Sequence, residues 1–150
     1  RVINLVKSIQ KAAEENSEDP FLIALADRAT AVRDSFEDRQ TTTAGALDDL
    51  LRAIEDNLER KRWQAEKGLD DLTSFVFLRL REAGIACPEL VSKNVSRWFA
   101  DYPNWRRSEF ELRELRKKVT FAIFAEEDDM NKVAAVVEGL FAVLQRSYRP

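Results

Sequence analysis

Glycine and proline are scarce in this sequence, and their scarcity limits the folds open to it. Only four residues of each type occur among 150. A sheet needs a turn every few residues, and turns are built mostly from Gly, Pro, Asn, Asp and Ser. Alanine, leucine, glutamate and arginine are abundant instead, and these residues have high helix propensity. We therefore expect an all-α fold made of long helices.

Apolar residues recur at spacings of three and four, as they do on one face of a helix. Before the polar stretch at 40–43, a narrow stripe typical of coiled coils contains Leu22, Leu25, Ala29, Val32 and Phe36. After it, the apolar positions are Leu47, Leu50, Leu51, Ile54 and Leu58. A helix over 44–67 is about 36 Å long, and its second half is polar nearly all round. We expect these two helices to form a long antiparallel pair.

Local start and stop signals divide the chain further. Asp19 followed by Pro20 is typical of a helix start, and Ser108 with Glu111 matches a capping box. Gly68 and Gly84 are expected helix stops. Gly139, inside the last helix, suggests close approach by another helix. The sequence predicts a bundle of six or seven helices over about 2–15, 20–39, 44–67, 69–83, 88–102, 108–125 and 130–144.

No Pro-, Gly- or Ser-rich linker interrupts this pattern, so we expect one helical domain over residues 1–150. The chain opens on Arg1, directly inside a helical pattern, and is therefore expected to be a piece of a longer protein. No apolar run approaches the length of about 18 residues that a membrane span needs, and no signal peptide is recognisable. We predict a cytoplasmic location.

Several catalytic chemistries are excluded by composition. Histidine is absent and cysteine occurs once, which rules out Cys/His zinc sites, Ser-His-Asp triads and Cys-His nucleophiles. The four glycines cannot form a phosphate-binding loop. The acidic run at 126–129 suits the start of a helix, where acids meet the positive end of the dipole. We predict no catalytic, cofactor-binding or metal-binding residue.

Charge is uneven, and one stretch is basic. The net charge is −3 overall, yet six bases lie between 106 and 118, close to aromatic side chains. Arg113, Arg116, Lys117 and Lys118 are therefore candidate nucleic-acid contacts, because bases and aromatic rings suit phosphates and stacked nucleobases. Glutamates at helical spacing among them allow the alternative of an ordinary salt-bridged helix face. Both interpretations stay open.

The tryptophans offer a second kind of surface. Aromatic anchors surrounded by arginine are common at the centres of protein interfaces. The candidate partner-binding residues are Trp63, Trp98, Trp105, Arg106 and Arg107. The alternative is that all three tryptophans belong to the core.

The order of several segments resembles a known family. Phe36-Glu37-Asp38-Arg39-Gln40-Thr41, Ala46-Leu47, Leu50-Leu51, Ile54 and Glu66-Lys67-Gly68-Leu69 stand in this order, followed by Trp105-Arg106-Arg107-Ser108 and the stretch from Arg113 to Val119. Together they resemble the C-terminal helical region of the R (motor and endonuclease) subunit of type I restriction–modification enzymes. The resemblance extends over most of residues 36 to 144.

The resemblance implies a non-catalytic C-terminal domain that docks an ATP-dependent DNA translocase and endonuclease onto a methyltransferase core. Its partners would be the methyltransferase and specificity subunits of a DNA restriction complex, with DNA reached only through that complex and neither a membrane nor a small-molecule substrate involved. The parent protein would be a type I site-specific deoxyribonuclease, whereas this piece would need no cofactor. The alternative function is a helical nucleic-acid-binding domain that uses the basic stretch at 106–118.

Overall fold

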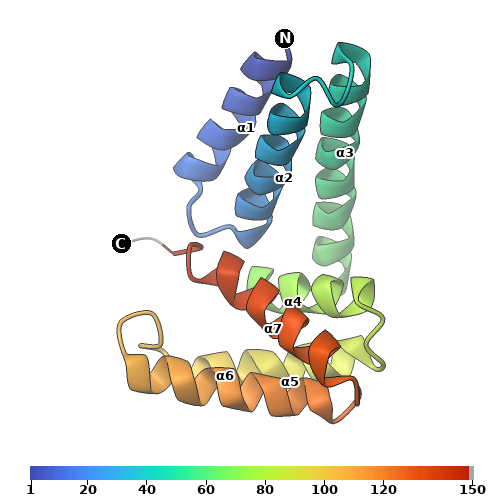
Figure 1. Ribbon diagram of the computed structural model, residues 1–150. Coiled ribbons are helices and arrows are strands. Elements are labelled where there is room, and N and C mark those ends of the chain that lie inside the picture. Colours follow the sequence, from blue (N-terminus) through green and yellow to red (C-terminus); the bar gives the residue numbers. More distant parts are fainter. Residues whose placement is uncertain (149–150) are drawn as a thin grey trace. The chain divides into compact units, whose positions relative to one another are not determined.

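The computed structural model describes residues 1–148, and within them the chain is entirely helical, with seven helices and no strand (Figure 1). The predicted all-α fold class is confirmed. The helices are α1 (Val2–Glu15), α2 (Pro20–Glu37), α3 (Thr43–Lys67), α4 (Asp71–Glu82), α5 (Pro88–Asp101), α6 (Glu109–Phe124) and α7 (Met130–Leu144).

Side-chain caps explain where most of these helices begin. The Asp19 carboxylate accepts a hydrogen bond from the Phe21 amide at 2.9 Å, and Asp70 accepts one from the Thr73 amide at 2.7 Å. Because Asp70 is the cap, α4 begins at Asp71 and not at 69 as predicted. Half of the predicted capping box forms: Glu111 donates its amide to the Ser108 hydroxyl, but its carboxylate accepts from the amide of Asn104.

The contacts divide the chain into two compact units, whereas the sequence led us to expect a single bundle. Unit 1 contains Arg1–Gly68 together with the residues from Arg146 onwards, and unit 2 contains Leu69–Gln145. The first boundary is Gly68, which ends α3 in the left-handed conformation at φ 66°. A glycine adopts this conformation without a steric penalty, so the boundary needs no long linker. Each unit is described by itself.

In unit 1, α2 and α3 form the expected antiparallel pair, and α1 packs against both (Figure 1). Small side chains lie where the helices meet: Ala29, Ala46 and Ala53 are all buried. The remaining core includes Val2, Val6, Ile9 and Leu50, with Leu25, Val32 and Phe36 packed against it. The stripe predicted on α2 therefore faces the core.

In unit 2, α4 packs on α5, α6 packs on α5, and α7 contacts both α6 and α4. Each helix contributes buried apolar residues, among them Phe75, Val76, Leu80, Val91, Val95, Leu115, Val119, Ile123, Val137 and Leu140. The prediction for Gly139 is wrong. Among residues 1–148, no atom beyond its own turn lies within 4 Å of the position that a Cβ would occupy there, so none of their helices makes a close approach.

Candidate docking surfaces

Trp105 is a core residue. It follows α5 in the chain, its exposed fraction is 3%, and its ring meets the rings of Phe99 and Phe141 edge-on, with centroids 5.6 and 5.5 Å apart. Phe99 and Phe141 stack on each other at 5.4 Å. Edge-on and offset arrangements are those that aromatic rings favour. The prediction that Trp105 is a surface anchor for a partner is therefore wrong. For this tryptophan the alternative stated above, a place in the core, is correct.

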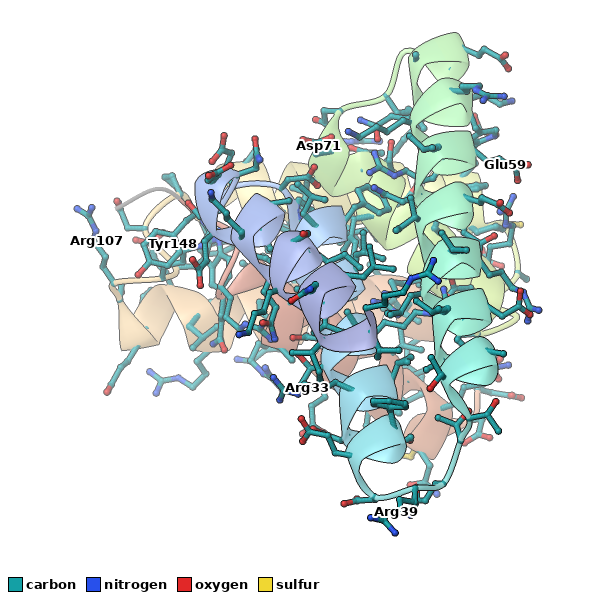
Figure 2. All side chains as sticks on the ribbon, turned by 90° about the horizontal axis from the view of Figure 1, so that it is seen from above. Arg33, Arg39, Glu59, Asp71, Arg107 and Tyr148 are labelled. Atoms are coloured by element: carbon teal, nitrogen blue, oxygen red, sulfur yellow. The ribbon has the colours of Figure 1, made fainter. Side chains whose placement is uncertain are left out.

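Arg106 is engaged within unit 2. Its Nε and Nη2 atoms donate to the carbonyl oxygen of Leu144 at 3.2 and 2.9 Å, and its guanidinium lies 4.3 Å from the centre of the Trp105 ring. Leu144 is the last residue of α7, whose terminal carbonyls lack partners within the helix. Arg106 therefore caps α7. Arg107, by contrast, projects away from the helices (Figure 2).

Trp63 and Trp98 are both half-buried, but they belong to different units. Trp98 lies on α5 beneath the ammonium of Lys118, which is 5.1 Å from the ring centre. Trp63 lies on α3 in unit 1. The five predicted partner-binding residues thus do not assemble into one site within either unit.

The candidate nucleic-acid contacts all lie on α6, but each has a contact inside the protein. Lys117 pairs with Glu114 at 3.0 Å, and Lys118 covers Trp98. The two arginines lie near aromatic rings: Arg113 is 6.0 Å from the centre of the Phe110 ring and Arg116 is 5.0 Å from that of Phe141. With about 3.6 residues per turn, the four bases point over more than half of the helix circumference. They form no single basic face.

An apolar seam lies exposed on α3. Leu51 and Leu58, two of the apolar positions predicted for this helix, are 52% and 50% exposed. With the half-buried Leu47 and Ile54 they form a row at spacings of four, three and four, hereafter the α3 seam. A second row, Ala46, Leu50 and Ala53, is fully buried, and the seam residues Leu47 and Ile54 also pack against the core. Two apolar rows on one helix were visible in the sequence, but their spacing does not say which row is covered.

Charged side chains lie beside the α3 seam. Glu55, Lys61 and Arg62 are exposed on the same helix. Glu59 lies on the outer side of α3 as well (Figure 2). An apolar row with both signs of charge at its edges has the composition of a helix–helix docking surface.

A second exposed apolar surface lies on α6. Phe110 and Phe121 are 61% and 65% exposed, and the ion-paired Glu114 and Lys117 lie between them. These four residues, again spaced by four, three and four, are hereafter the α6 stripe. The opposite side of the same helix contains the buried Leu115, Val119 and Ile123. No partner was predicted for these phenylalanines from the sequence, although their separation by three helical turns was a usable signal.

The acidic run at 126–129 serves the start of α7, as predicted. Asp129 accepts hydrogen bonds from the amides of Asn131 and Lys132 at 3.1 and 3.2 Å. The Asp129 amide and the Lys132 ammonium, which donate to Glu127 at 3.1 and 3.0 Å, hold the pKa of that carboxyl below its usual value. Within residues 1–148 no group of three or more His, Cys, Asp or Glu side chains is arranged to hold a metal ion.

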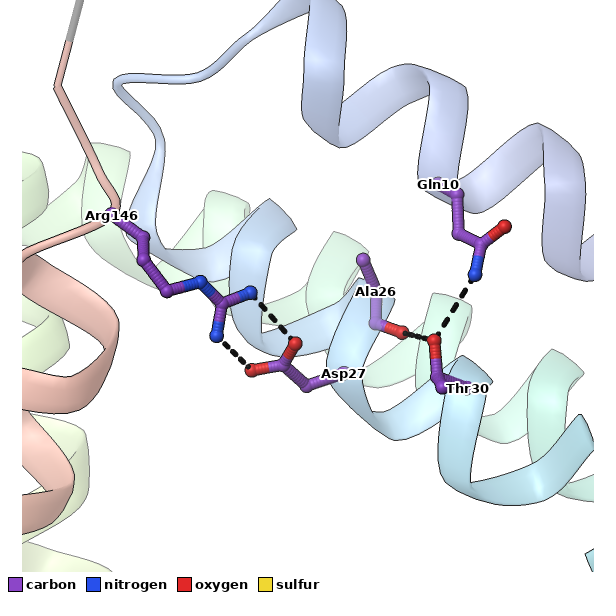
Figure 3. Close-up of polar contacts among 5 residues, drawn as sticks. All are labelled: Gln10, Ala26, Asp27, Thr30 and Arg146. Atoms are coloured by element: carbon purple, nitrogen blue, oxygen red, sulfur yellow. Dashed lines mark hydrogen bonds and ion pairs between the residues drawn. The ribbon is translucent and has the colours of Figure 1, made fainter. Parts of the chain in front are cut away.

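An open cleft of about 440 Å³ in unit 1 lies beside α1 and α2 (Figure 3). Its polar lining is largely paired within the chain. Gln10 donates to the Thr30 hydroxyl at 3.1 Å, and Thr30 donates to the Ala26 carbonyl at 3.0 Å. The Arg146 guanidinium binds both carboxylate oxygens of Asp27 at 2.8 and 2.9 Å. The two bonds from Arg146 hold the segment that follows α7 against α2.

Comparison of the chain with protein-family models, with curated proteins and with solved structures finds no match. In the part of the chain that the structure describes, no helix has both the length and the apolar character needed to cross a membrane.

Proposed function

We propose that this chain is a helical assembly domain that docks one protein onto another through the α3 seam. The observation that carries the proposal is the half-exposure of Leu51 and Leu58, seven residues apart on one side of a 25-residue helix. Leucines at heptad spacing are the anchors by which one amphipathic helix lies against another. Covering the remaining surface of each leucine contributes about 1–2 kcal/mol at roughly 25 cal/mol per Å².

The resemblance to type I restriction enzymes names the partner. Seven of the positions that carry it lie on α3, and three of these, Leu47, Leu51 and Ile54, belong to the α3 seam. In this proposal the chain is the C-terminal assembly domain of an R subunit, and a helix of the methyltransferase core occupies the seam. The complex acts on DNA in the cytoplasm, while the ATP-dependent motor and the nuclease lie elsewhere in the parent protein.

Co-purification with the methyltransferase and specificity subunits of a type I restriction enzyme from the same organism tests the proposal. Leu51→Glu with Leu58→Glu should lower the recovered complex by at least about tenfold, because two anchors are replaced by charges. The matched control is Asp49→Lys with Glu66→Lys, which changes two exposed side chains of the same helix outside the α3 seam and should retain the complex. Equal loss in both pairs, or no complex with the wild type, would contradict the proposal.

The alternative of a nucleic-acid-binding domain receives less support. Arg113, Arg116, Lys117 and Lys118 each have a neighbour within the chain and do not share one face. DNA titration at several salt concentrations distinguishes the two functions, since phosphate contacts produce a steep loss of affinity with salt. A steep slope that Lys117→Glu reduces, together with no binding to the methyltransferase subunits, would favour the alternative.

A further inference from the structure

The α6 stripe lies on the side of α6 directly opposite its core contacts. Phe110 and Phe121 are separated by eleven residues, which is close to three full turns, so both rings project in the same direction. Glu114 and Lys117 lie between them and pair with each other at 3.0 Å. The stripe therefore combines two exposed phenylalanines with one acid and one base and has no net charge.

The order of these residues has an internal symmetry. Phe110 and Phe121 lie equally far from the midpoint between Leu115 and Arg116, and so do Glu114 and Lys117. When two copies of such a helix lie antiparallel about a two-fold axis at that midpoint, Phe110 faces Phe121 of the second copy. Glu114 then faces Lys117 of the second copy, and the same two contacts recur on the other side of the axis. Isologous interfaces require this self-complementarity.

We infer that α6 is a homotypic interface, through which two copies of the chain pair antiparallel along the α6 stripe. Each copy supplies a phenylalanine ring to every aromatic contact and a carboxylate or an ammonium group to every ion pair. The neighbouring charges do not oppose this arrangement. Lys118 is directed to Trp98, and Arg113 lies at the margin of the stripe near Phe110. The inference concerns a different helix, unit and partner from the docking proposed for α3.

The size of the surface sets the strength of the pairing. A helix of 16 residues is about 24 Å long, and one such pair buries less than the roughly 1,200 Å² of a standard stable interface. Self-association should therefore be weak and depend on concentration. It would gain strength in a larger assembly in which other contacts hold two copies together.

Sedimentation velocity of the full chain, at concentrations from about 10 µM to about 1 mM, tests the inference. Reductant is included because Cys87 is an exposed free thiol. The mean mass of the wild type should rise from 17.3 kDa towards twice that value. Glu114→Lys or Lys117→Glu alone places like charges opposite each other on both sides of the axis and should weaken association by at least about tenfold.

Mixing those two single variants is the decisive measurement. A Glu114→Lys copy presents two bases and a Lys117→Glu copy presents two acids, so the mixture should recover association to within about threefold of the wild type. Altered stability of either helix cannot produce this recovery, because mixing leaves each chain unchanged. Leu51→Glu with Leu58→Glu serves as the control and should associate like the wild type.

Three outcomes would overturn the inference. One is a wild type that stays monomeric throughout the series, in which case any occupant of the α6 stripe is a different protein. Another is single variants that associate as strongly as the wild type. The third is a mixture of the two variants that remains as weak as either alone.

Discussion

Arg106 donates two hydrogen bonds to the carbonyl oxygen of Leu144, 38 residues later in the chain. The contact joins the loop before α6 to the last residue of α7. A helix leaves its final carbonyl groups without partners, and a guanidinium placed there satisfies them and opposes the negative end of the dipole. Because the same guanidinium lies over Trp105, it also covers the aromatic core of unit 2.

Replacing Arg106 should therefore destabilise unit 2. Arg106→Gln removes both donors and the contact with the Trp105 ring, and we expect the free energy of unfolding to fall by about 1–3 kcal/mol. The matched control is Arg107→Gln, since the neighbouring Arg107 side chain projects away from the helices (Figure 2). Urea unfolding followed by circular dichroism measures both variants. Equal stability of the two would show that the bonds to Leu144 contribute nothing.

The tryptophans should differ in their contribution to stability. Trp105→Ala removes a buried ring from between Phe99 and Phe141 and should cost about 3–5 kcal/mol. Trp98→Ala removes a half-buried ring and its contact with Lys118, with an expected cost of about 1–2 kcal/mol. Denaturant titration of both variants checks the order, and the reverse order would contradict the placement of Trp105 in the core.

Glu127 should make stability depend on pH at the acid end. The amide of Asp129 and the ammonium of Lys132 lower its folded-state pKa below the ordinary 4.5. Its contribution is therefore complete above that value and is lost as the pH falls through the lowered pKa. We expect the stability difference between the wild type and Glu127→Gln to be largest above about pH 5 and to shrink in more acidic solution.

Thermal unfolding at a series of pH values measures that difference, and NMR titration of the Glu127 carboxyl gives its pKa directly. Glu126→Gln is the control, because it changes the neighbouring acid in the same turn. A stability difference that stays constant from neutral to acid pH would show that the Glu127 pKa is not lowered by folding.

The Asp27–Arg146 ion pair should hold the segment that follows α7 against α2, and its strength should depend on the salt concentration. The Asp27 carboxylate raises the pKa of the Arg146 guanidinium, which therefore stays charged. Both side chains are about half exposed, so Asp27→Asn should cost only about 0.2–1 kcal/mol at low salt and less at high salt. Hydrogen exchange at 146–148 should become faster in that variant.

The charge-swapped variant Asp27→Arg with Arg146→Asp is the control for the pairing. Exchange as slow as in the wild type would confirm the ion pair, and exchange that is unchanged in Asp27→Asn would contradict it.

Helix ends were the features best predicted from sequence. Asp19, Ser108 and Gly68 all lie where their local chemistry indicated, because a cap depends on backbone groups within three or four residues. The start of α4 was misplaced by two residues, since Asp70 was not identified as its cap. The all-α fold class was also predicted from local information, namely the scarcity of glycine and proline and the abundance of helix-forming residues.

Burial was predicted less well, and the errors share one cause. Leu50 and Leu51 are identical neighbours, yet the first is fully buried and the second is half exposed. Trp105, which was predicted to be a partner-binding anchor, is enclosed by Phe99 and Phe141 from two other segments. Neither outcome is encoded within the helix or loop that carries the residue.

The amino-acid order is sufficient to define the helices found within residues 1–148 and most of their ends, because those depend on hydrogen bonds between near neighbours. Which apolar rows are covered depends on helices distant in sequence. Packing places Leu50 and Ala53 of α3 against α1 and α2 while leaving Leu51 and Leu58 exposed, and it leaves Phe110 and Phe121 uncovered on α6. Burial is decided by the neighbours that long-range packing supplies, so both candidate docking surfaces emerge only from the folded structure.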